Sequence, residues 1–205
     1  MPRDRAMAGE EVLRLLEESR ALRRGHFKLS SGLHSEAYVQ CARLLEMPAR
    51  ARRVGEALAA RLRQHRLESV LSPALGGVLI GHAVAAALEV PFRFTERYDG
   101  EMALRRGFRL QPGERVAVVE DVVTTGRSSG ECAAVARERQ AEVVAIGAIL
   151  DRSGGRHGFA VPFEWLLELD LANYDSTACP LCDHGVPLEK PGSRPEPRRL
   201  SERGL

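Results

Sequence analysis

The chain has 205 residues, of which 44% are hydrophobic and 28% are charged, and its formal net charge is +2. This length suits one well-buried domain with small additions, and a net charge so near zero gives no support for a nucleic-acid partner. The most apolar stretch, residues 76–90, is too short to cross a membrane, and no secretory signal opens the chain, so we expect a cytoplasmic protein without a membrane partner.

Helices and strands are both predicted in the first third of the chain. Apolar residues recur at helical spacing from Val12 to Leu22, and we expect Gly25 to end this helix. The pattern then changes, and residues 26–41 are typical of a strand, a glycine turn and a second strand. Pro48 is expected to open another amphipathic helix.

Strands and helices alternate regularly through the rest of the chain. This rhythm predicts an α/β fold with a central parallel sheet that is covered by helices on both faces. Ligands of such sheets bind beyond the carboxyl ends of the strands. We expect a polar connection over residues 96–107, strands at 69–72, 90–95, 115–120, 142–150 and 163–170, and helices at 76–89 and 129–140.

The stretch VAVVEDVVTTGRSSG, residues 116–130, leads from a buried strand into two acids and then into a loop of hydroxyls and glycines. A loop that opens a helix presents free backbone N–H groups, and the helix dipole there favours an anion. Thr124, Thr125, Ser128 and Ser129 add hydroxyl donors. The sequence therefore predicts a phosphate-binding loop, which is neither a Walker loop nor a dinucleotide fingerprint.

The acids Glu120 and Asp121 would lie beside the bound phosphate, which is unfavourable unless they bind something else. Carboxylates accept hydrogen bonds from neighbouring sugar hydroxyls, so the combination favours a sugar phosphate. The alternative is that the two acids are a helix cap and a metal-ligand pair in an unrelated fold.

The segment VVEDVVTTGRSSGE resembles the signature of type I phosphoribosyltransferases, which bind 5-phosphoribosyl 1-diphosphate. The resemblance implies a central parallel sheet flanked by helices, a small N-terminal hood and an extended C-terminal tail. SPALGG, residues 72–77, resembles the family's pyrophosphate loop, with an ordinary strand-to-helix turn as the alternative. The residues that the resemblance assigns to the donor are Glu120, Asp121, Val122, Val123, Thr124, Thr125, Gly126, Arg127 and Ser128.

Two other segments, GHFKLSSGLHSEAYVQC and LDRSGG, resemble those of orotate phosphoribosyltransferases. This resemblance implies that Thr124 and Arg152 contact orotate. An arginine fork suits a base that carries a carboxylate and two ring carbonyls. The alternative for Arg152 is a surface ion pair with Asp151 or Asp170.

The resemblance also implies the chemistry: transfer of the phosphoribosyl group to orotate, with Mg²⁺ as cofactor, in a homodimer with shared active sites. Cleavage at C1 of the ribose creates a cationic centre, and Asp121 would orient the ribose and offset that charge. The mobile loop of many relatives carries Lys and His, but residues 96–107 contain neither. Arg97 matches a basic position of that loop best, with Arg105 and Arg106 as further candidates.

The resemblance covers roughly residues 25–193 and implies one domain over residues 1–190, with a hood from residues 1–45 and a C-terminal segment. A flexible tail is expected at 191–205. Two other functions stay open. A purine-type transferase fits the core motif but not the N-terminal segment, and a non-catalytic regulator that senses the donor would need more than the one helix expected before His26.

Cys179, Cys182 and His184 form a C-x-x-C-x-H pattern near the end of the chain. Three ligands are one short of a closed structural zinc site, so Cys41 or a partner chain would have to complete it. We therefore expect reduced structural cysteines without a metal.

Overall fold

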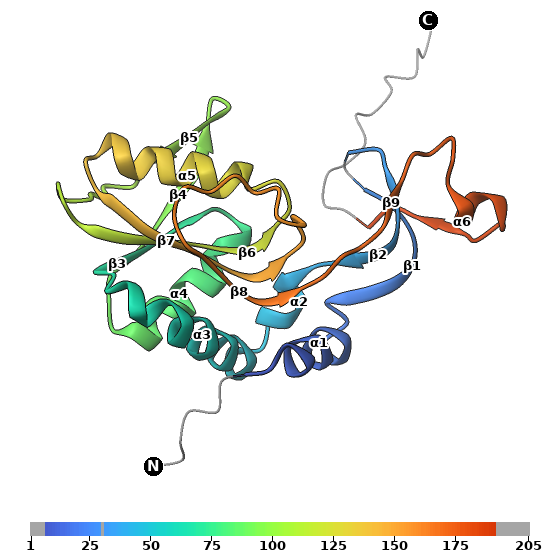
Figure 1. The fold of residues 1–205 in the computed structure, drawn as a ribbon, viewed down its shortest axis with the longest axis horizontal. Coiled ribbons are helices and arrows are strands. Elements are labelled where there is room, and N and C mark those ends of the chain that lie inside the picture. The colour runs from blue at the N-terminus through green and yellow to red at the C-terminus, as the bar shows by residue number, and fades with distance from the viewer. Residues whose placement is uncertain (1–6, 30, 192–205) are drawn as a thin grey trace, which may run out of the picture. The chain divides into compact units, whose positions relative to one another are not determined.

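The computed structural model describes residues 7–29 and 31–191, which form two compact units (Figure 1). The first unit contains residues 7–21 and Gln40–Asp170, and the second contains Leu22–Val39 and residues 171–191. Of the expected tail, residues 192–205 lie outside the described part. Across the described ranges, no helix has the length and apolar character that a membrane span requires.

The first unit is built on a six-stranded sheet with the order β5-β4-β3-β6-β7-β8, which confirms the predicted α/β class. The four pairings from β4 to β8 are parallel, and β5 is antiparallel to β4 at one edge. The strands are β3 (Ser69–Pro73), β4 (Phe92–Tyr98), β5 (Glu101–Leu104), β6 (Arg115–Val123), β7 (Glu142–Asp151) and β8 (Phe163–Glu168).

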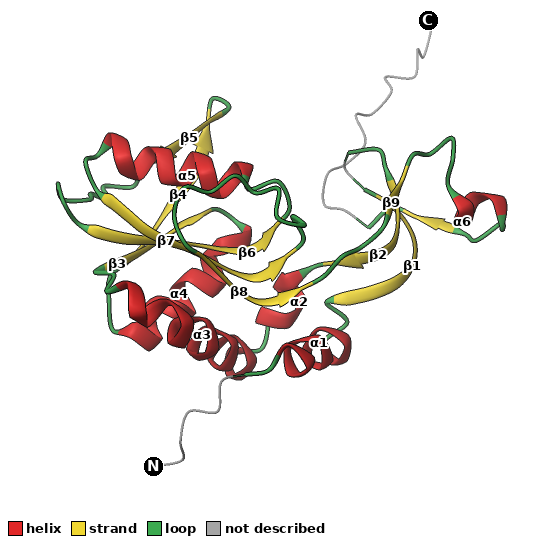
Figure 2. Cartoon of the chain, viewed as in Figure 1, coloured by secondary structure: helices red, strands yellow, loops and turns green. Residues whose placement is uncertain are grey.

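Helices cover both faces of this sheet, with α5 on one face and α3 and α4 on the other (Figures 1 and 2). Val116 and Val118 of β6 pack against Cys132 of α5. On the opposite face of the sheet, Leu62 of α3 packs against Gly147. Strands buried on both faces are continuously apolar, as the sequence predicted. The helices are α1 (Gly9–Glu18), α2 (Cys41–Leu45), α3 (Pro48–Leu62), a 3-10 turn η1 (Arg63–His65), α4 (Gly76–Leu88) and α5 (Arg127–Glu138).

The first helix ends earlier than the sequence indicated. The Ser19 hydroxyl donates a hydrogen bond to the Leu15 carbonyl at 2.7 Å, and Arg20 has a left-handed φ of 55°. These local contacts stop the helix at Glu18, so Leu22 begins a strand although its spacing fits the helix. The prediction that the helix continues to Gly25 was wrong, because side-chain bonding to the backbone competes with helix continuation.

The polar connection expected over residues 96–107 contains a β-hairpin. The strands β4 and β5 are joined at Asp99 and Gly100, both of which have a positive φ, of 50° and 87°. Asp-Gly is a strong signal for a two-residue hairpin turn, because such turns need positive φ at both positions. Because the flanking residues are mostly polar, no alternation of apolar residues marks this hairpin in the sequence.

The second unit is a small four-stranded sheet with the order β10-β1-β2-β9 (Figure 2). The antiparallel pair of β1 and β2 confirms the two strands predicted over residues 26–41. The segment after residue 170 belongs to this unit and supplies two short strands and a helical turn. The elements are β1 (Leu22–Lys28), β2 (His34–Val39), β9 (Asn173–Tyr174), α6 (Pro180–Asp183) and β10 (Leu188–Glu189).

Candidate active site

A pocket with about 260 Å³ of empty space lies where β6 gives way to α5. The first bond within α5 is donated by the Gly130 amide to the Gly126 carbonyl, so the amides of the preceding residues have no acceptor inside the helix. Hydroxyls and amide N–H groups therefore face an anion-sized space at a helix N-terminus. The pocket is lined by Glu120, Val122, Val123, Thr124, Thr125, Gly126, Arg127, Ser128 and Ser129.

Gly126 fixes the shape of this loop. Its φ is 74°, and a Cβ atom there would lie 2.6 Å from the His157 carbonyl oxygen and 2.8 Å from the Phe159 ring. No larger residue fits without moving the backbone beneath it. The loop is therefore held against residues 157–159 by close packing as well as by its own turn.

The two acids belong to the last residues of β6 and meet a second loop. A Cβ atom at Gly76 would lie 2.7 Å from Asp121 Oδ1, and one at Gly77 would lie 3.2 Å from Glu120 Oε1. These glycines begin α4 and end the SPALGG segment, so the structure brings the predicted pyrophosphate loop against the acids. A side chain at Gly76 would occupy the space of the Asp121 carboxylate, and a Cβ atom at Gly77 would lie 2.7 Å from the Val119 carbonyl oxygen, so both positions need glycine.

Glu120 is buried, with 7% of its surface exposed, and burial raises the pKa of both acids. The Asp121 charge raises the pKa of Glu120 further. The Val122 amide donates to Asp121 Oδ1 at 2.8 Å, which holds that carboxyl group in place. Two carboxylates that water solvates poorly are a suitable acceptor for a diol or a cation.

The raised pKa of Glu120 predicts a pH-dependent cost in stability. The folded state holds this proton more tightly than the unfolded chain, whose Glu pKa is about 4.3, so stability is lost as the pH rises above that value. Each unit by which the pKa is raised corresponds to roughly 3–6 °C in a chain of this size, so Glu120→Gln should raise Tm at pH 8 by at least that amount. At pH 4.5 the difference should be small. Thermal unfolding of the ligand-free protein at both pH values measures it.

The control is Glu138→Gln, which removes an exposed acid of α5 and should leave Tm unchanged at both pH values. A Glu120→Gln variant less stable than the parent at pH 8 would contradict the assignment of a buried carboxyl group with a raised pKa.

Arg152 follows β7 directly beside the phosphate loop. Val123 is paired with Asp151 across the sheet, and the Arg152 amide donates to the Val123 carbonyl at 2.8 Å. In the described chain the buried Nε of Arg152 has no hydrogen-bond partner, and no carboxylate pairs with the guanidinium. Desolvation lowers the pKa of Arg152. The surface ion pair considered as an alternative is therefore absent from the described residues, and a buried donor is left for a ligand.

Cys41 was not assigned to the site by the sequence analysis. Its buried thiol begins α2, and its pKa is raised well above the usual value by burial and by the charges of Asp121 and Glu120. Arg152 acts on the same thiol with the opposite sign. The acids and Arg152 thus share a neighbour, and no sequence spacing could have indicated it.

Arg97 is paired in this structure. It contacts Glu131 of α5 and donates to the Gly100 carbonyl at 2.9 Å. Glu131 also pairs with Arg127, so Arg97 is attached to the helix that begins at the phosphate loop. Arg105 instead lies 4.0 Å from the centre of the Tyr98 ring, within the hairpin.

A mostly parallel sheet whose central strand carries two acids near its end and leads into a hydroxyl-rich loop defines a type I phosphoribosyltransferase. The fold is similar to that of a solved orotate phosphoribosyltransferase from Aeropyrum pernix, with a TM-score of 0.64 and 26% identity. That match covers 77% of this chain and 93% of the other.

Curated relatives identify the branch. A protein of Thermotoga maritima named orotate phosphoribosyltransferase is 54% identical over 183 residues, which span 89% of this chain and 98% of that protein. A protein of the same name from Caldanaerobacter subterraneus is 44% identical, over 92% of this chain and 99% of that one. No family model matches the chain. The chain belongs to the orotate phosphoribosyltransferase family.

Proposed function

We propose that this enzyme transfers the phosphoribosyl group of 5-phosphoribosyl 1-diphosphate to orotate, giving orotidine 5'-monophosphate and pyrophosphate in pyrimidine nucleotide synthesis. The observation that carries the proposal is the junction of β6 and α5, where a buried acid pair and a phosphate-sized loop adjoin an unpaired arginine. The family names of the relatives favour orotate over a purine and a catalyst over a regulator.

The donor is held by its 5-phosphate and by its ribose. The phosphate accepts hydrogen bonds from the amides and hydroxyls of Thr124–Ser128, and Glu120 and Asp121 accept hydrogen bonds from the ribose diol. Arg152 donates to the carboxylate or to a ring carbonyl of orotate, and Thr124 contacts the same base. The sugar is then fixed between the leaving group and the attacking base.

Mg²⁺ fits this chemistry, because the buried acids offer the oxygen ligands that it prefers beside substrate phosphates. When bound, the ion neutralises charge on the departing pyrophosphate. The protein's own contribution is charge and position. Asp121 offsets the positive charge that develops at C1, and Arg97 stabilises the pyrophosphate in place of the Lys and His of many relatives.

We also propose that the active form is a cytoplasmic homodimer with shared sites, as the family resemblance implies.

The direct test of the activity is to mix the purified protein with orotate, the donor and Mg²⁺ and to follow the loss of orotate absorbance. Adenine, hypoxanthine and uracil should be poor acceptors. Rapid turnover of a purine without consumption of orotate would overturn the assignment.

Arg152→Ala should raise the apparent KM for orotate by about 10- to 150-fold, the range for a hydrogen bond to a charged group. The KM for the donor should change little, because residues 120–128 are untouched. Arg152→Lys should restore little activity, since a point charge cannot form two parallel bonds. Steady-state kinetics with each substrate varied in turn measure both constants.

The matched control is Arg156→Ala, which removes an exposed arginine from the same loop and should leave both constants unchanged. A rise in the donor KM alone would place Arg152 in the phosphate site.

A further inference from the structure

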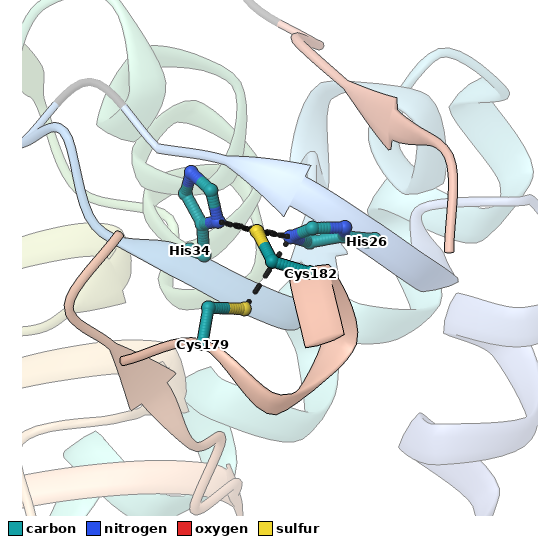
Figure 3. A group of neighbouring side chains, drawn as sticks. All are labelled: His26, His34, Cys179 and Cys182. Carbon is teal, nitrogen blue, oxygen red and sulfur yellow. Dashed lines mark hydrogen bonds between the residues drawn. The ribbon is translucent and has the colours of Figure 1, made fainter. Parts of the chain in front are cut away.

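Four metal-ligating side chains converge in the second unit, away from the phosphate loop in sequence. They are His26, His34, Cys179 and Cys182, and one ligand atom from each lies within 4.8 Å of all the others. Figure 3 shows the two rings and the two sulfur atoms pointing toward one another. Cys182 is exposed, and the other three are buried.

The ligands come from two parts of the chain that are far apart in sequence. His26 lies on β1 and His34 on β2, the two strands of the antiparallel pair. Cys179 precedes α6 and Cys182 lies within it, and the Cys182 amide donates to the Cys179 carbonyl at 3.0 Å. This turn places both sulfur atoms on one side, as the C-x-x-C spacing of zinc sites does.

The tautomer of His26 is fixed by its surroundings. Its Nδ1 lies 2.8 Å from the Val186 carbonyl oxygen, which can only accept a hydrogen bond. Nδ1 therefore carries the proton, and Nε2 presents a lone pair to the cluster. Histidines that bind metals usually donate their other N–H to a carbonyl or a carboxylate in this way.

The spacing of the ligand atoms fits a tetrahedron around one ion. Zinc bonds of about 2.3 Å to sulfur and about 2.0–2.1 Å to nitrogen place a sulfur and a nitrogen about 3.6 Å apart in that geometry. The His26 Nε2 to Cys179 Sγ distance is 3.5 Å, and Cys182 Sγ lies 3.8 Å from His26 Nε2 and 3.4 Å from His34 Nδ1. The two nitrogens are 2.9 Å apart, somewhat closer than about 3.3 Å.

We propose that the second unit binds one structural zinc ion through His26, His34, Cys179 and Cys182. Thiolate and imidazole ligands in a tetrahedron select zinc over magnesium and calcium. Two thiols release their protons on binding, so that two thiolates balance the charge of Zn²⁺ and the site is neutral. Four protein ligands complete the coordination, which leaves no open position for a substrate.

The expected role of the ion is to hold the β1–β2 pair to the C-terminal segment. Among the described residues of this unit, the buried hydrophobic side chains are those of Leu22, Phe27, Ala37 and Cys179. Such a small set gives little hydrophobic stabilisation, and small units of this kind are commonly held by a metal.

The structure also corrects the ligand set considered from the sequence. His184 and Cys41 are not in the cluster, and two histidines outside the C-x-x-C-x-H pattern are. The imidazole of His184 instead lies 2.5 Å from the Pro180 carbonyl through its Nδ1.

The test uses the full-length chain, purified without a metal-affinity step. Elemental analysis should find about one zinc per chain. Co²⁺ added to chelator-treated protein should give the visible bands of tetrahedral, thiolate-bound cobalt, and removal of zinc should lower Tm. A parent protein that holds no zinc after incubation with the metal, and that gives no such cobalt spectrum, would overturn the proposal.

Variants test the ligand set. Cys182→Ser should weaken metal binding by more than about a hundredfold, beyond the loss seen when only an outer-shell partner is removed. His184→Ala, the matched control within the same motif, should keep one zinc and the cobalt spectrum. Cobalt bands that persist unchanged in Cys182→Ser would contradict the assignment. If that variant does not fold, the metal content and the cobalt spectrum of the parent and of His184→Ala still show whether the second unit binds zinc.

Discussion

Asp121→Asn is expected to lower kcat by about a hundredfold or more, the scale seen when one preorganised electrostatic group is lost at a reacting centre. The variant keeps the shape of the side chain beside Gly76 and removes its charge. Since positive charge at C1 develops only in the transition state, the loss should fall on kcat more than on binding of the donor.

Equilibrium binding of the donor and single-turnover kinetics at saturating donor separate the two effects. Equal losses in affinity and rate would show that Asp121 only anchors the ribose. Because burial raises the pKa of this acid, the parent should also lose activity as the pH falls and the pair takes up protons, and the variant should lose that part of the dependence.

Arg97→Ala is expected to lower kcat by a similar factor, about a hundredfold, if Arg97 stabilises the departing pyrophosphate. The choice of Arg97 is motivated by its contact with the helix that begins at the phosphate loop. Arg97 pairs with Glu131, one helical turn from Arg127, whereas Arg105 packs on Tyr98. In this role Arg97 is expected to exchange its contact with Glu131 for one with the pyrophosphate.

The control is Arg105→Ala on the same hairpin, which should cost much less. Glu131→Gln is a further measurement, since it releases Arg97 without removing it and should leave kcat largely intact. Steady-state kinetics of all three variants decide between the arginines. A harmless Arg97→Ala together with an inactive Arg105→Ala would assign the role to Arg105.

The edge hairpin and the second unit show where sequence patterns were insufficient. The residues on both sides of Asp99 and Gly100 are mostly polar and show no alternation with apolar residues. The sequence between β4 and β5 therefore resembles a loop, although it forms a hairpin. The short strands β9 and β10 have two residues each, too few for any periodicity. Both of these short strands pair with strands that are distant in sequence.

The succession of strands and helices and the phosphate loop after β6 could be predicted from the sequence alone, because each element depends on contiguous residues. Apolar runs specify buried strands, and a loop at a helix N-terminus carries its donors with it. The assignment of the phosphate loop to donor binding remains a prediction.

The contacts between residues that are distant in sequence became evident only from the folded chain. Pairing of β6 with β7 brings Arg152 beside Val123, and packing of α4 brings Gly76 against Asp121. Pairing of β1 with β2 and the turn at α6 collect His26 and His34 around two cysteines that are about 150 residues further along the chain. These contacts depend on strand register and on helix packing, which no local spacing in the sequence encodes. In a strand, a shift of one residue would turn each side chain to the opposite face.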